Sequence, residues 1–424
     1  MRHSLILALA LALSAPALAI DGFVGCSTSD DCWPFDLQTH QVRPSIPLMG
    51  FGDYPYDATV TPDGMHVWFI GASGGGAVVI SRTSGALVAI VPLAEYVVSV
   101  AFDRDGTRAF VSSRDETSLN IVDTASYGVV DTLPLPVDGG NLALEPVGGK
   151  LYLVDWYGPI LCEVAGDGSA VLRQAALGSS LWQIVAAPDG QHVYVTDRGT
   201  DEVLEVALDT FTVSRRFDVG DDPWGLDVTA DGTTLVVTCE DSAEVVLIDL
   251  ATGAVTPIAL DPSADPRDVD ILDEAGLAYV AGGTATGYQS PVYVVDLPSA
   301  TVVETLDGPG INANVVAVQA QMHEAPTAAE TPDAPASLAV HPNPFNPRAT
   351  VTWQIAAPAA GTIAVHDLAG RRVRTLVQGV LPAGTRTATW DGRDASGRAL
   401  PSGTYLVSLR TGAATMVRKV VLAR

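Results

Sequence analysis

Residues that can bind ligands or metals recur at one position of a regular repeat in this chain. Five turn glycines lie 42 residues apart, at Gly64, Gly106, Gly148, Gly190 and Gly232. Seven residues before each glycine, and at the matching places of two further units, stand Asp57, Ser99, Asn141, Gln183, Gly225, Asp268 and Asn312. Two residues further along stand Thr59, Ala101, Ala143, Val185, Asp227, Asp270 and Asn314. Because one position recurs in every unit, we expect these side chains to gather in one region of the fold.

The carboxylates in this set indicate one kind of chemistry. Asp57, Asp227, Asp268 and Asp270 offer oxygen ligands, which suit Ca²⁺ or Mg²⁺ rather than a transition metal. The sequence therefore allows a Ca²⁺ or Mg²⁺ site built from these four carboxylates. The alternative is a water-filled channel whose polar side chains bind only solvent.

Aromatic and amide groups indicate a second kind of chemistry. Directly before the aligned position stand Tyr56, Trp182, Trp224 and Arg267, and nearby loops add Trp156, Tyr157 and Arg198. We expect these residues to form a rim around the polar side chains of Asp57, Asn141 and Gln183. An aromatic rim around a polar floor suits a sugar, a peptide or a small organic ligand.

Motifs that would carry catalysis are missing from the sequence. The seven histidines have no metal-ligand spacing, and neither a P-loop nor a dinucleotide fingerprint occurs. We therefore assign no catalytic residue, and we expect binding rather than catalysis.

The elements that must position these residues are short strands. Each unit reads as a strand, a tight Gly turn, a second strand such as HVYVT, and two more strands separated by polar loops. Four short strands in about 42 residues are typical of one blade of a β-propeller. The turn glycine supplies the positive φ that such a turn needs.

Two fragments complete the ring. Residues 311–319 look like a first strand with nothing after it, and residues 23–48 look like the three strands that would follow. Joined in one sheet, they make a seventh blade and remove an exposed sheet edge. We therefore predict an all-β, seven-bladed propeller over residues 20–319, closed by strands from both of its ends.

The repeat resembles a known family. HVYVTDRGTDEVLEVALDT at 192–210 and TLVVTCEDSAEVVLIDLATGAV at 234–255 are similar to the YVTN β-propeller repeat. That resemblance implies a secreted or cell-surface binding or scaffold protein. Relatives with the same architecture include lactone-hydrolysing enzymes that use a channel metal, so the alternative is a secreted metal-dependent lactonase-like hydrolase with its site at the channel mouth.

The C-terminal part differs from the repeats in its amino-acid composition. Residues 320–337 are rich in Ala, Pro and Thr and are predicted to be a disordered linker, and residues 338–424 are predicted to be a small β-sandwich. The motifs PNPFNP, DLAGR, WDG and SGTY resemble the Ig-like domain of flagellar hook-capping proteins and the type A sorting domain of type IX secretion. The resemblance implies export machinery as a partner and attachment to the cell surface.

Charge and the N-terminus bear on the compartment. The net charge of −26 excludes a general nucleic-acid binder, and the 338–424 segment is basic, with 11 Lys and Arg against three Asp. Residues 1–19 have the basic start, apolar run and Ala-Leu-Ala end of a signal peptide, and no later stretch is apolar enough to span a membrane. We therefore expect a secreted or outer-surface bacterial monomer with an extracellular protein, peptide or glycan ligand. In that oxidising compartment, Cys26 and Cys32 on either side of a polar turn predict a short disulfide.

Overall fold

The structure is a computed structural model of the chain, and it divides into two compact units, Met1–Pro326 and Thr327–Arg424. It describes residues 21–48, 53–73, 75–93, 96–115, 117–284, 290–307, 310, 312–318, 337–341, 345–346, 348–355, 359–366, 371–381, 384–394, 398–411 and 415–423. Within these residues the secondary structure is β-strand, apart from a 3-10 turn, η1 (Asp273–Ala275). The predicted signal peptide lies outside the described residues, as does the predicted linker except for its last residue, Ser337.

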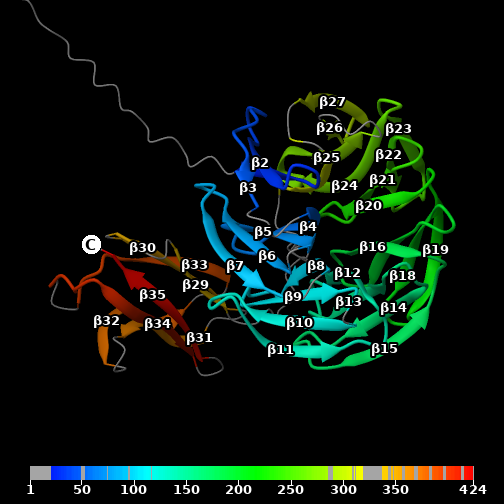
Figure 1. Ribbon diagram of the computed structural model, residues 1–424. Helices are drawn as coiled ribbons and strands as arrows, with labels where there is room; N and C mark the ends of the chain where they lie inside the picture. Colours follow the sequence, from blue (N-terminus) through cyan, green and yellow to red (C-terminus); the bar gives the residue numbers. More distant parts are fainter. Residues whose placement is uncertain are drawn as a thin grey trace, which may run out of the picture. The chain divides into compact units, whose positions relative to one another are not determined.

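Six four-stranded antiparallel sheets follow one another along the first unit (Figure 1). Blade 1 is β4 (Asp53–Val60), β5 (His66–Ser73), β6 (Gly76–Ser81) and β7 (Leu87–Pro92). Blade 2 is β8 (Val97–Phe102), β9 (Arg108–Ser113), β10 (Ser118–Asp123) and β11 (Gly128–Pro134). Blade 3 is β12 (Gly139–Leu144), β13 (Leu151–Asp155), β14 (Ile160–Val164) and β15 (Val171–Ala176).

The next three blades repeat this order. Blade 4 is β16 (Leu181–Ala186), β17 (His192–Asp197), β18 (Glu202–Ala207) and β19 (Thr212–Asp218). Blade 5 is β20 (Pro223–Val228), β21 (Thr234–Cys239), β22 (Glu244–Asp249) and β23 (Val255–Ala259). Blade 6 is β24 (Ala264–Leu272), β25 (Leu277–Thr284), β26 (Val292–Asp296) and β27 (Thr301–Leu306).

The seventh blade joins the two ends of the propeller, as predicted. Its sheet order is β28 (Ala313–Ala317), β1 (Asp21–Cys26), β2 (Asp31–Asp36) and β3 (Ile46–Pro47). The innermost strand β28 runs antiparallel to β1, with Phe23 opposite Ala317. A seven-bladed propeller closed by strands from distant parts of the sequence is therefore confirmed.

Burial explains why the strands alternate as they do. Strands in the middle of a blade are apolar on both faces because each blade packs between two others; β17, for example, is buried from Val193 to Asp197. The outermost strand β15 instead alternates between half-buried and exposed residues. The cores therefore lie between successive blades, as where Tyr152 of blade 3 packs with Leu204 of blade 4.

The turn glycines are shifted in two blades. Gly64, Gly106, Gly190 and Gly232 have the predicted positive φ, of 64° to 70°. In blade 3 the residue with positive φ is Gly149 rather than the predicted Gly148, and in blade 6 it is Gly276, one residue after Ala275. The 42-residue spacing located each turn correctly to within one residue.

The predicted disulfide between Cys26 and Cys32 is wrong. Both are free, buried thiols whose pKa is raised by burial. Across the β1–β2 pair, Cys32 lies opposite Gly25 and Cys26 lies opposite Asp31. Neighbouring residues of a strand point to opposite faces, so Cys26 faces the core beside blade 6 and Cys32 faces the core beside blade 1.

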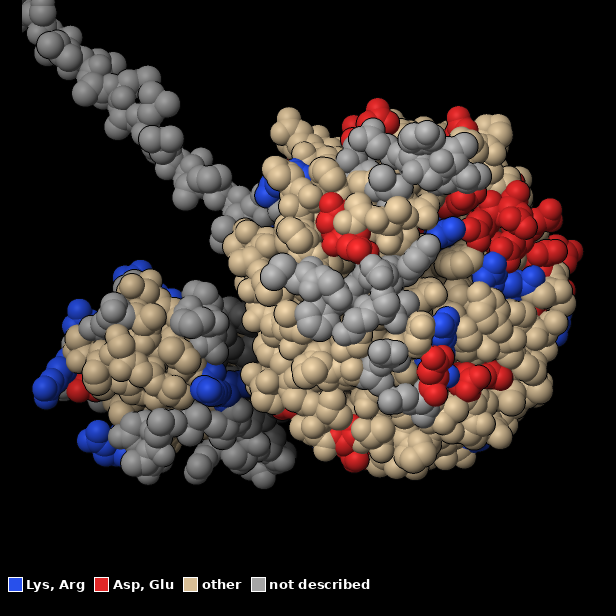
Figure 2. All heavy atoms as spheres, viewed as in Figure 1, with Lys and Arg blue, Asp and Glu red and all other residues tan. Residues whose placement is uncertain are grey.

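The second unit has two sheets. One has the order β29 (Ser337–His341), β30 (Ala349–Ile355) and β33 (Gly384–Trp390); the other has the order β32 (Arg372–Leu381), β31 (Ala359–His366), β34 (Gly403–Thr411) and β35 (Thr415–Leu422). Their shared core contains Phe345, Trp353, Trp390 and Tyr405. Lys and Arg side chains gather on this unit, whereas Asp and Glu side chains form patches on the propeller (Figure 2).

Among the described residues, the structure has no helix that is long and apolar enough to cross a bilayer.

Candidate functional site

The seven innermost strands each change register close to their first residues. In β4 the shift lies between Pro55 and Asp57, and in β24 it lies between Pro266 and Asp268. The residue inside such a bulge is turned out of the regular alternation. Within these shifts lie Tyr56, Val98, Gly140, Trp182, Trp224, Arg267 and Asn314. The bulges therefore direct large side chains to the end of the channel where the strands begin.

Five of the predicted aromatic residues meet at that end. Trp156 lies at the centre, with its ring centroid 5.6 Å from Tyr56, 5.2 Å from Tyr157 and 4.5 Å from Trp182. Trp182 continues the cluster to Trp224 at 4.7 Å. Tyr157 is 53 % exposed, whereas Trp182 is only 4 % exposed. We call these five residues the aromatic mouth. Four of them line a small cavity that also reaches Asn141, Gln183 and Asp268.

Arg198 stacks on two tryptophans of the aromatic mouth. Its guanidinium carbon lies 4.1 Å from the ring centroid of Trp224 and 5.0 Å from that of Trp182. Its Nε donates to Asp222 Oδ1 at 2.5 Å, and a second guanidinium nitrogen contacts Asp222 Oδ2. Stacking and a two-pronged ion pair together fix the orientation of the guanidinium plane.

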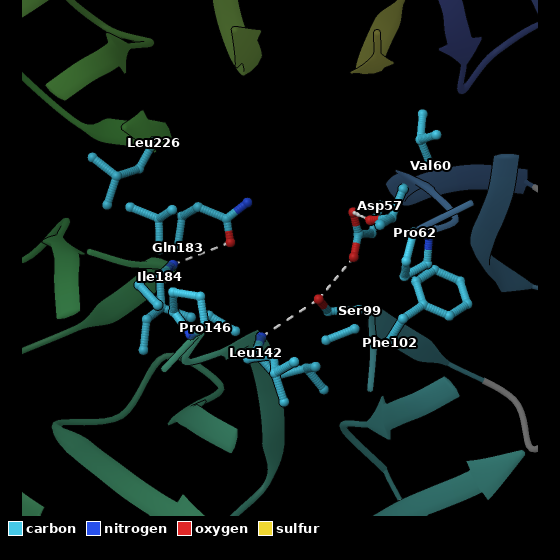
Figure 3. A pocket seen from close by; sticks show the side chains of 16 residues that line it. Asp57, Val60, Pro62, Ser99, Phe102, Leu142, Pro146, Gln183, Ile184 and Leu226 are labelled. Atoms are coloured by element: carbon cyan, nitrogen blue, oxygen red, sulfur yellow. Dashed lines mark hydrogen bonds between the residues drawn. The ribbon is translucent and has the colours of Figure 1, made fainter. Parts of the chain in front are cut away.

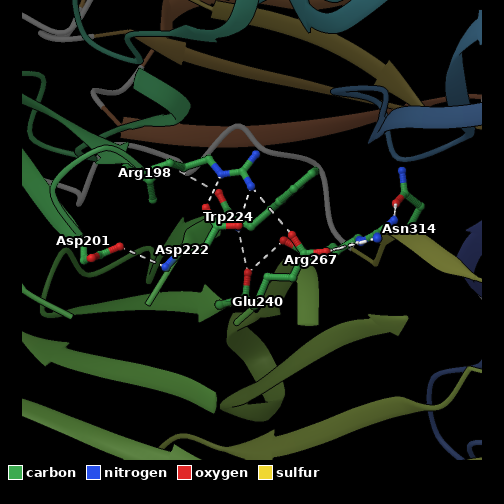
Figure 4. A network of polar contacts seen from close by, with 10 residues as sticks. Arg198, Asp201, Asp222, Trp224, Glu240, Arg267 and Asn314 are labelled. Atoms are coloured by element: carbon green, nitrogen blue, oxygen red, sulfur yellow. Dashed lines mark hydrogen bonds and ion pairs between the residues drawn. The ribbon is translucent and has the colours of Figure 1, made fainter. Parts of the chain in front are cut away.

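A polar network extends from this contact across blades 5, 6 and 7 (Figure 4). Glu240 accepts from Arg267 Nε at 3.1 Å and lies 3.8 Å from Arg198. Arg267 also donates to Asn314 Oδ1 at 2.8 Å, and Asn314 donates to the carbonyl oxygen of Pro55 at 2.6 Å. Burial raises the pKa of Glu240, although the two nearby arginines lower it. The predicted residue Arg267 is therefore part of the mouth, but through Glu240 and Asn314.

The four carboxylates predicted as metal ligands instead accept hydrogen bonds from the neighbouring blade. Asp57 Oδ2 accepts from Ser99 Oγ and from the backbone N–H of Val100, both at 2.8 Å. The same bond to the next blade recurs in Asp227 to Ile271 N–H at 2.9 Å, Asp268 to Val316 N–H at 2.9 Å and Asp270 to Val318 N–H at 2.7 Å. These side chains therefore join neighbouring blades.

The predicted metal set is consequently wrong as a cluster. Among the described residues, no group of three or more His, Cys, Asp or Glu side chains is arranged to hold a metal ion. Burial raises the pKa of Asp57, and it raises that of Asp268 well above the usual range, with the charges of Asp57 and Asp270 adding to the effect. The four carboxylates come from three blades, with Asp268 and Asp270 on the same strand, β24. Each accepts a hydrogen bond from a backbone N–H of the next blade rather than turning its oxygens to a shared ion.

The amide and glycine residues at the first aligned position of the blades differ in their roles. Asn141 Nδ2 donates to the carbonyl oxygen of Trp182 at 2.9 Å, so it links two blades. Gly225 has no room for a side chain, because a Cβ there would lie 2.3 Å from the carbonyl oxygen of Arg267. In blade 7 the aligned residue is Val315 rather than the expected Asn312, because Val316 N–H pairs with Asp268 as Val100 N–H pairs with Asp57. Asn314 accordingly sits at the bulge position.

A larger pocket, which sequence reasoning missed, lies further along the same strands. It is lined by residues of blades 1 to 5. Most of the residues that line it are apolar in type, with Phe102, Leu142, Ile184 and Leu226 among the larger side chains (Figure 3), but polar atoms make up more than half of the surface that faces it. The available signal was the row of small residues at the second aligned position: Thr59, Ala101, Ala143 and Val185.

Two family similarities cover parts of the chain. Residues 169–269 match the family described as "Lactonase, 7-bladed beta-propeller", and residues 342–414 match the family described as "FlgD Ig-like domain". The first match spans the end of blade 3, blades 4 and 5 and the start of β24. No curated protein matches this chain.

Solved structures share the propeller fold. A functionally unknown protein from Desulfotomaculum acetoxidans is 17% identical, with a TM-score of 0.60, covering 71% of this chain and 99% of that one. Dihydro-heme d1 dehydrogenase NirN is 14% identical, with a TM-score of 0.53, covering 87% and 75%. Hydrazine synthase from Kuenenia stuttgartiensis is 15% identical, with a TM-score of 0.51, covering 61% and 79%. At such identities the likeness concerns the fold alone.

Proposed function

We propose that the protein is an exported, non-catalytic binding module whose propeller binds an extracellular oligosaccharide at the aromatic mouth. The observation that carries this proposal is the convergence of five aromatic side chains from blades 1, 3, 4 and 5, with Arg198 stacked on two of them.

The chemistry of the mouth suits a sugar. The C–H face of a sugar ring packs against an aromatic face, and its hydroxyls pair with nearby carboxylate, amide and guanidinium groups. Tyr157 is exposed and available for such a contact, while Trp156 and Trp182 support it from below. Asp222 and Glu240 hold the neighbouring arginines in place.

Export is the second part of the proposal. The signal-like residues 1–19 and the similarity of residues 342–414 to the FlgD Ig-like domain support it. The C-terminal unit would then engage the export machinery or the cell surface, with its exposed basic side chains attracting anionic groups. Fractionation of the native host, with the chain followed by antibody, tests this: retention in the cytoplasm would contradict it.

Binding is tested with the full chain on an array of soluble oligosaccharides. We expect Tyr157→Ala to weaken binding of any oligosaccharide that is captured by about tenfold or more, as for an exposed aromatic hot spot. Met65→Ala is the matched control, because Met65 is 46 % exposed and follows the turn glycine Gly64, away from the aromatic mouth. Capture of peptides alone, or binding unchanged by Tyr157→Ala, would overturn the oligosaccharide assignment.

A lactone-hydrolysing activity is the second candidate, and the lactonase match over residues 169–269 favours it. The bonds that Asp57, Asp227, Asp268 and Asp270 make to the backbone of the next blade do not fit the metal set that a metal-dependent form would need. Lactone turnover by the full chain, lost in Arg198→Ala, would support this candidate. Equal rates with and without protein would exclude it for the lactones tested.

Ca²⁺ separates the two candidates further. A ligand at 100 times its Kd adds about 2.7 kcal/mol to the folded state. We expect the same melting temperature in EDTA and in excess Ca²⁺, because the four channel carboxylates are engaged with backbone N–H groups. A clear rise with Ca²⁺, lost in Asp268→Asn, would restore the ion site.

A further inference from the structure

The larger pocket, lined by blades 1 to 5, exists because the inner strands on one side of the channel carry short side chains. At the second aligned position blades 1 to 4 carry Thr59, Ala101, Ala143 and Val185, which are short. Blades 5 and 6 carry Asp227 and Asp270 at the same position, and both are buried against the next blade. The open space therefore lies against the inner strands of blades 1 to 4.

Asp57 is the carboxylate that lines this pocket. Its Oδ2 accepts from Ser99 and Val100, and its Oδ1 is 3.3 Å from Thr59 Oγ1. These partners are neutral, and among the described residues Asp57 has no Lys, Arg or His within ion-pair distance. Neither Lys nor Arg occurs in the lining. Within the described part of the chain, the pocket thus holds an acid that has no countercharge.

Across the pocket stands Gln183. Its Oε1 accepts from the N–H of Ile184 at 3.2 Å, and within the described part of the chain its Nε2 has no hydrogen-bond partner. Figure 3 shows Asp57 and Gln183 pointing into the same open space from opposite sides. Phe102, Leu142 and Leu226 add apolar side chains to the lining.

From this arrangement we propose a second ligand site, in which a small organic amine places its ammonium group on Asp57 and its apolar body against Phe102, Leu142 and Leu226. The site is further along the channel than the aromatic mouth, whose cavity shares Gln183 with it, and it goes beyond the proposed function. An ammonium supplies the missing countercharge and donates to Oδ1, which has room for another hydrogen bond. An anionic ligand of the same size is repelled by Asp57 and meets no cation in the lining.

The raised pKa of Asp57 agrees with this assignment. Burial disfavours the charged carboxylate, and a bound ammonium would favour it. The charge of Asp57 also acts on the buried carboxyl group of Asp268 on blade 6, which is the titratable neighbour in this part of the channel. Amine affinity should therefore fall as the pH is lowered and these two carboxylates take up protons. The affinity of an uncharged ligand should not follow that curve.

The test compares three probes that have the same six-carbon skeleton and different polar ends: hexylamine, 1-hexanol and hexanoate. Each is titrated into the full chain by isothermal calorimetry near neutral pH. We expect hexylamine to bind about tenfold or more tightly than 1-hexanol, since a hydrogen bond to a charged group is worth more than a neutral one. We expect hexanoate not to bind. Equal affinities for the three probes, or no heat from hexylamine at millimolar concentration, would overturn the proposal.

Two variants locate the site. Asp57→Asn should reduce the affinity for hexylamine to that for 1-hexanol, and Asp115→Asn, at an exposed aspartate of blade 2, is its matched control. Ala143→Leu should fill the pocket and weaken both probes, and it tests the site even if Asp57→Asn fails to fold. Unchanged hexylamine affinity in Ala143→Leu would place the amine elsewhere. Tyr157→Ala should leave it unchanged, so failure of this site and failure of the aromatic mouth are distinguishable.

Discussion

The aromatic mouth and the larger pocket around Asp57 are built on the same innermost strands, a few residues apart. Strand β16 contributes Trp182 to the mouth and Ile184 to the pocket, and β20 contributes Trp224 and Leu226 in the same way. At the mouth, bulges turn large side chains outward, and the arginines are paired with Asp222 and Glu240. In the pocket, short side chains leave space, and Asp57 has no countercharge among the residues that the structure describes. The comparison shows that a repeated backbone offers equivalent positions whose chemistry depends on the side chain at each one.

The largest effect is expected where the mouth is most buried. Trp182→Ala removes a side chain in contact with Trp156, Tyr157 and Trp224, and it should lower the free energy of unfolding by about 3–5 kcal/mol. Calorimetry of the full chain measures it through the propeller transition. Tyr157→Ala, at an exposed position of the same cluster, should change stability by less than about 1 kcal/mol. Equal effects of the two variants would mean that the mouth is not the packed cluster described.

A smaller effect is expected from the ion pair that stiffens the mouth. Arg198→Ala leaves the carboxylate of Asp222 and the ring of Trp224 without their partner, and it should lower the free energy of unfolding by about 1–3 kcal/mol. Arg198→Lys keeps the charge but loses the fork and most of the stacking, so its loss should be intermediate. Urea denaturation of both variants measures the order. A lysine variant as unstable as the alanine variant would show that geometry, not charge, supports the mouth.

The smallest effect is a difference in pH dependence between the pocket and the outer turns. Burial raises the pKa of Asp57, so the folded state keeps this proton at pH values where the unfolded state has lost it, and stability falls as the pH rises from the ordinary aspartate pKa through the raised one. At the exposed turn residue Asp261, the Ser263 hydroxyl and backbone N–H lower the pKa. Its stabilising contribution is present above the ordinary pKa and is lost as the pH falls through the lowered one.

Variants at the two positions separate these contributions. Relative to the wild type, Asp57→Asn should gain stability as the pH is raised from the ordinary aspartate pKa through the raised pKa of Asp57. Asp261→Asn should lose stability relative to the wild type as the pH is raised through the lowered pKa of Asp261 to the ordinary one. Melting temperatures of the full chain across the acidic range measure both. The same sign for both variants would contradict the distinction between a buried acid without a countercharge and a turn acid bound by hydrogen bonds.

Most of the fold could be predicted because it follows from local repetition. A 42-residue period, alternating apolar residues and turn glycines recur in every unit, and the two fragments at 23–48 and 311–319 complete each other. The aromatic mouth could be predicted for the same reason, since Tyr56, Trp182 and Trp224 occupy one aligned position. Because the blade repeats, residues at the same aligned position of different inner strands are expected to lie at the same level of the channel.

What the sequence alone determined is therefore which side chains share a level of the channel. What those side chains are bonded to was decided only by the tertiary structure. The carboxylates of Asp57 and Asp268 look like metal ligands in the sequence, but the next blade brings a backbone N–H to each of them. Cys26 and Cys32 are close in sequence but lie on opposite faces of a sheet. The pocket around Asp57 exists because small residues from four blades meet there. The repeat places these residues at one aligned position, but only the packing of the blades shows that open space remains between them.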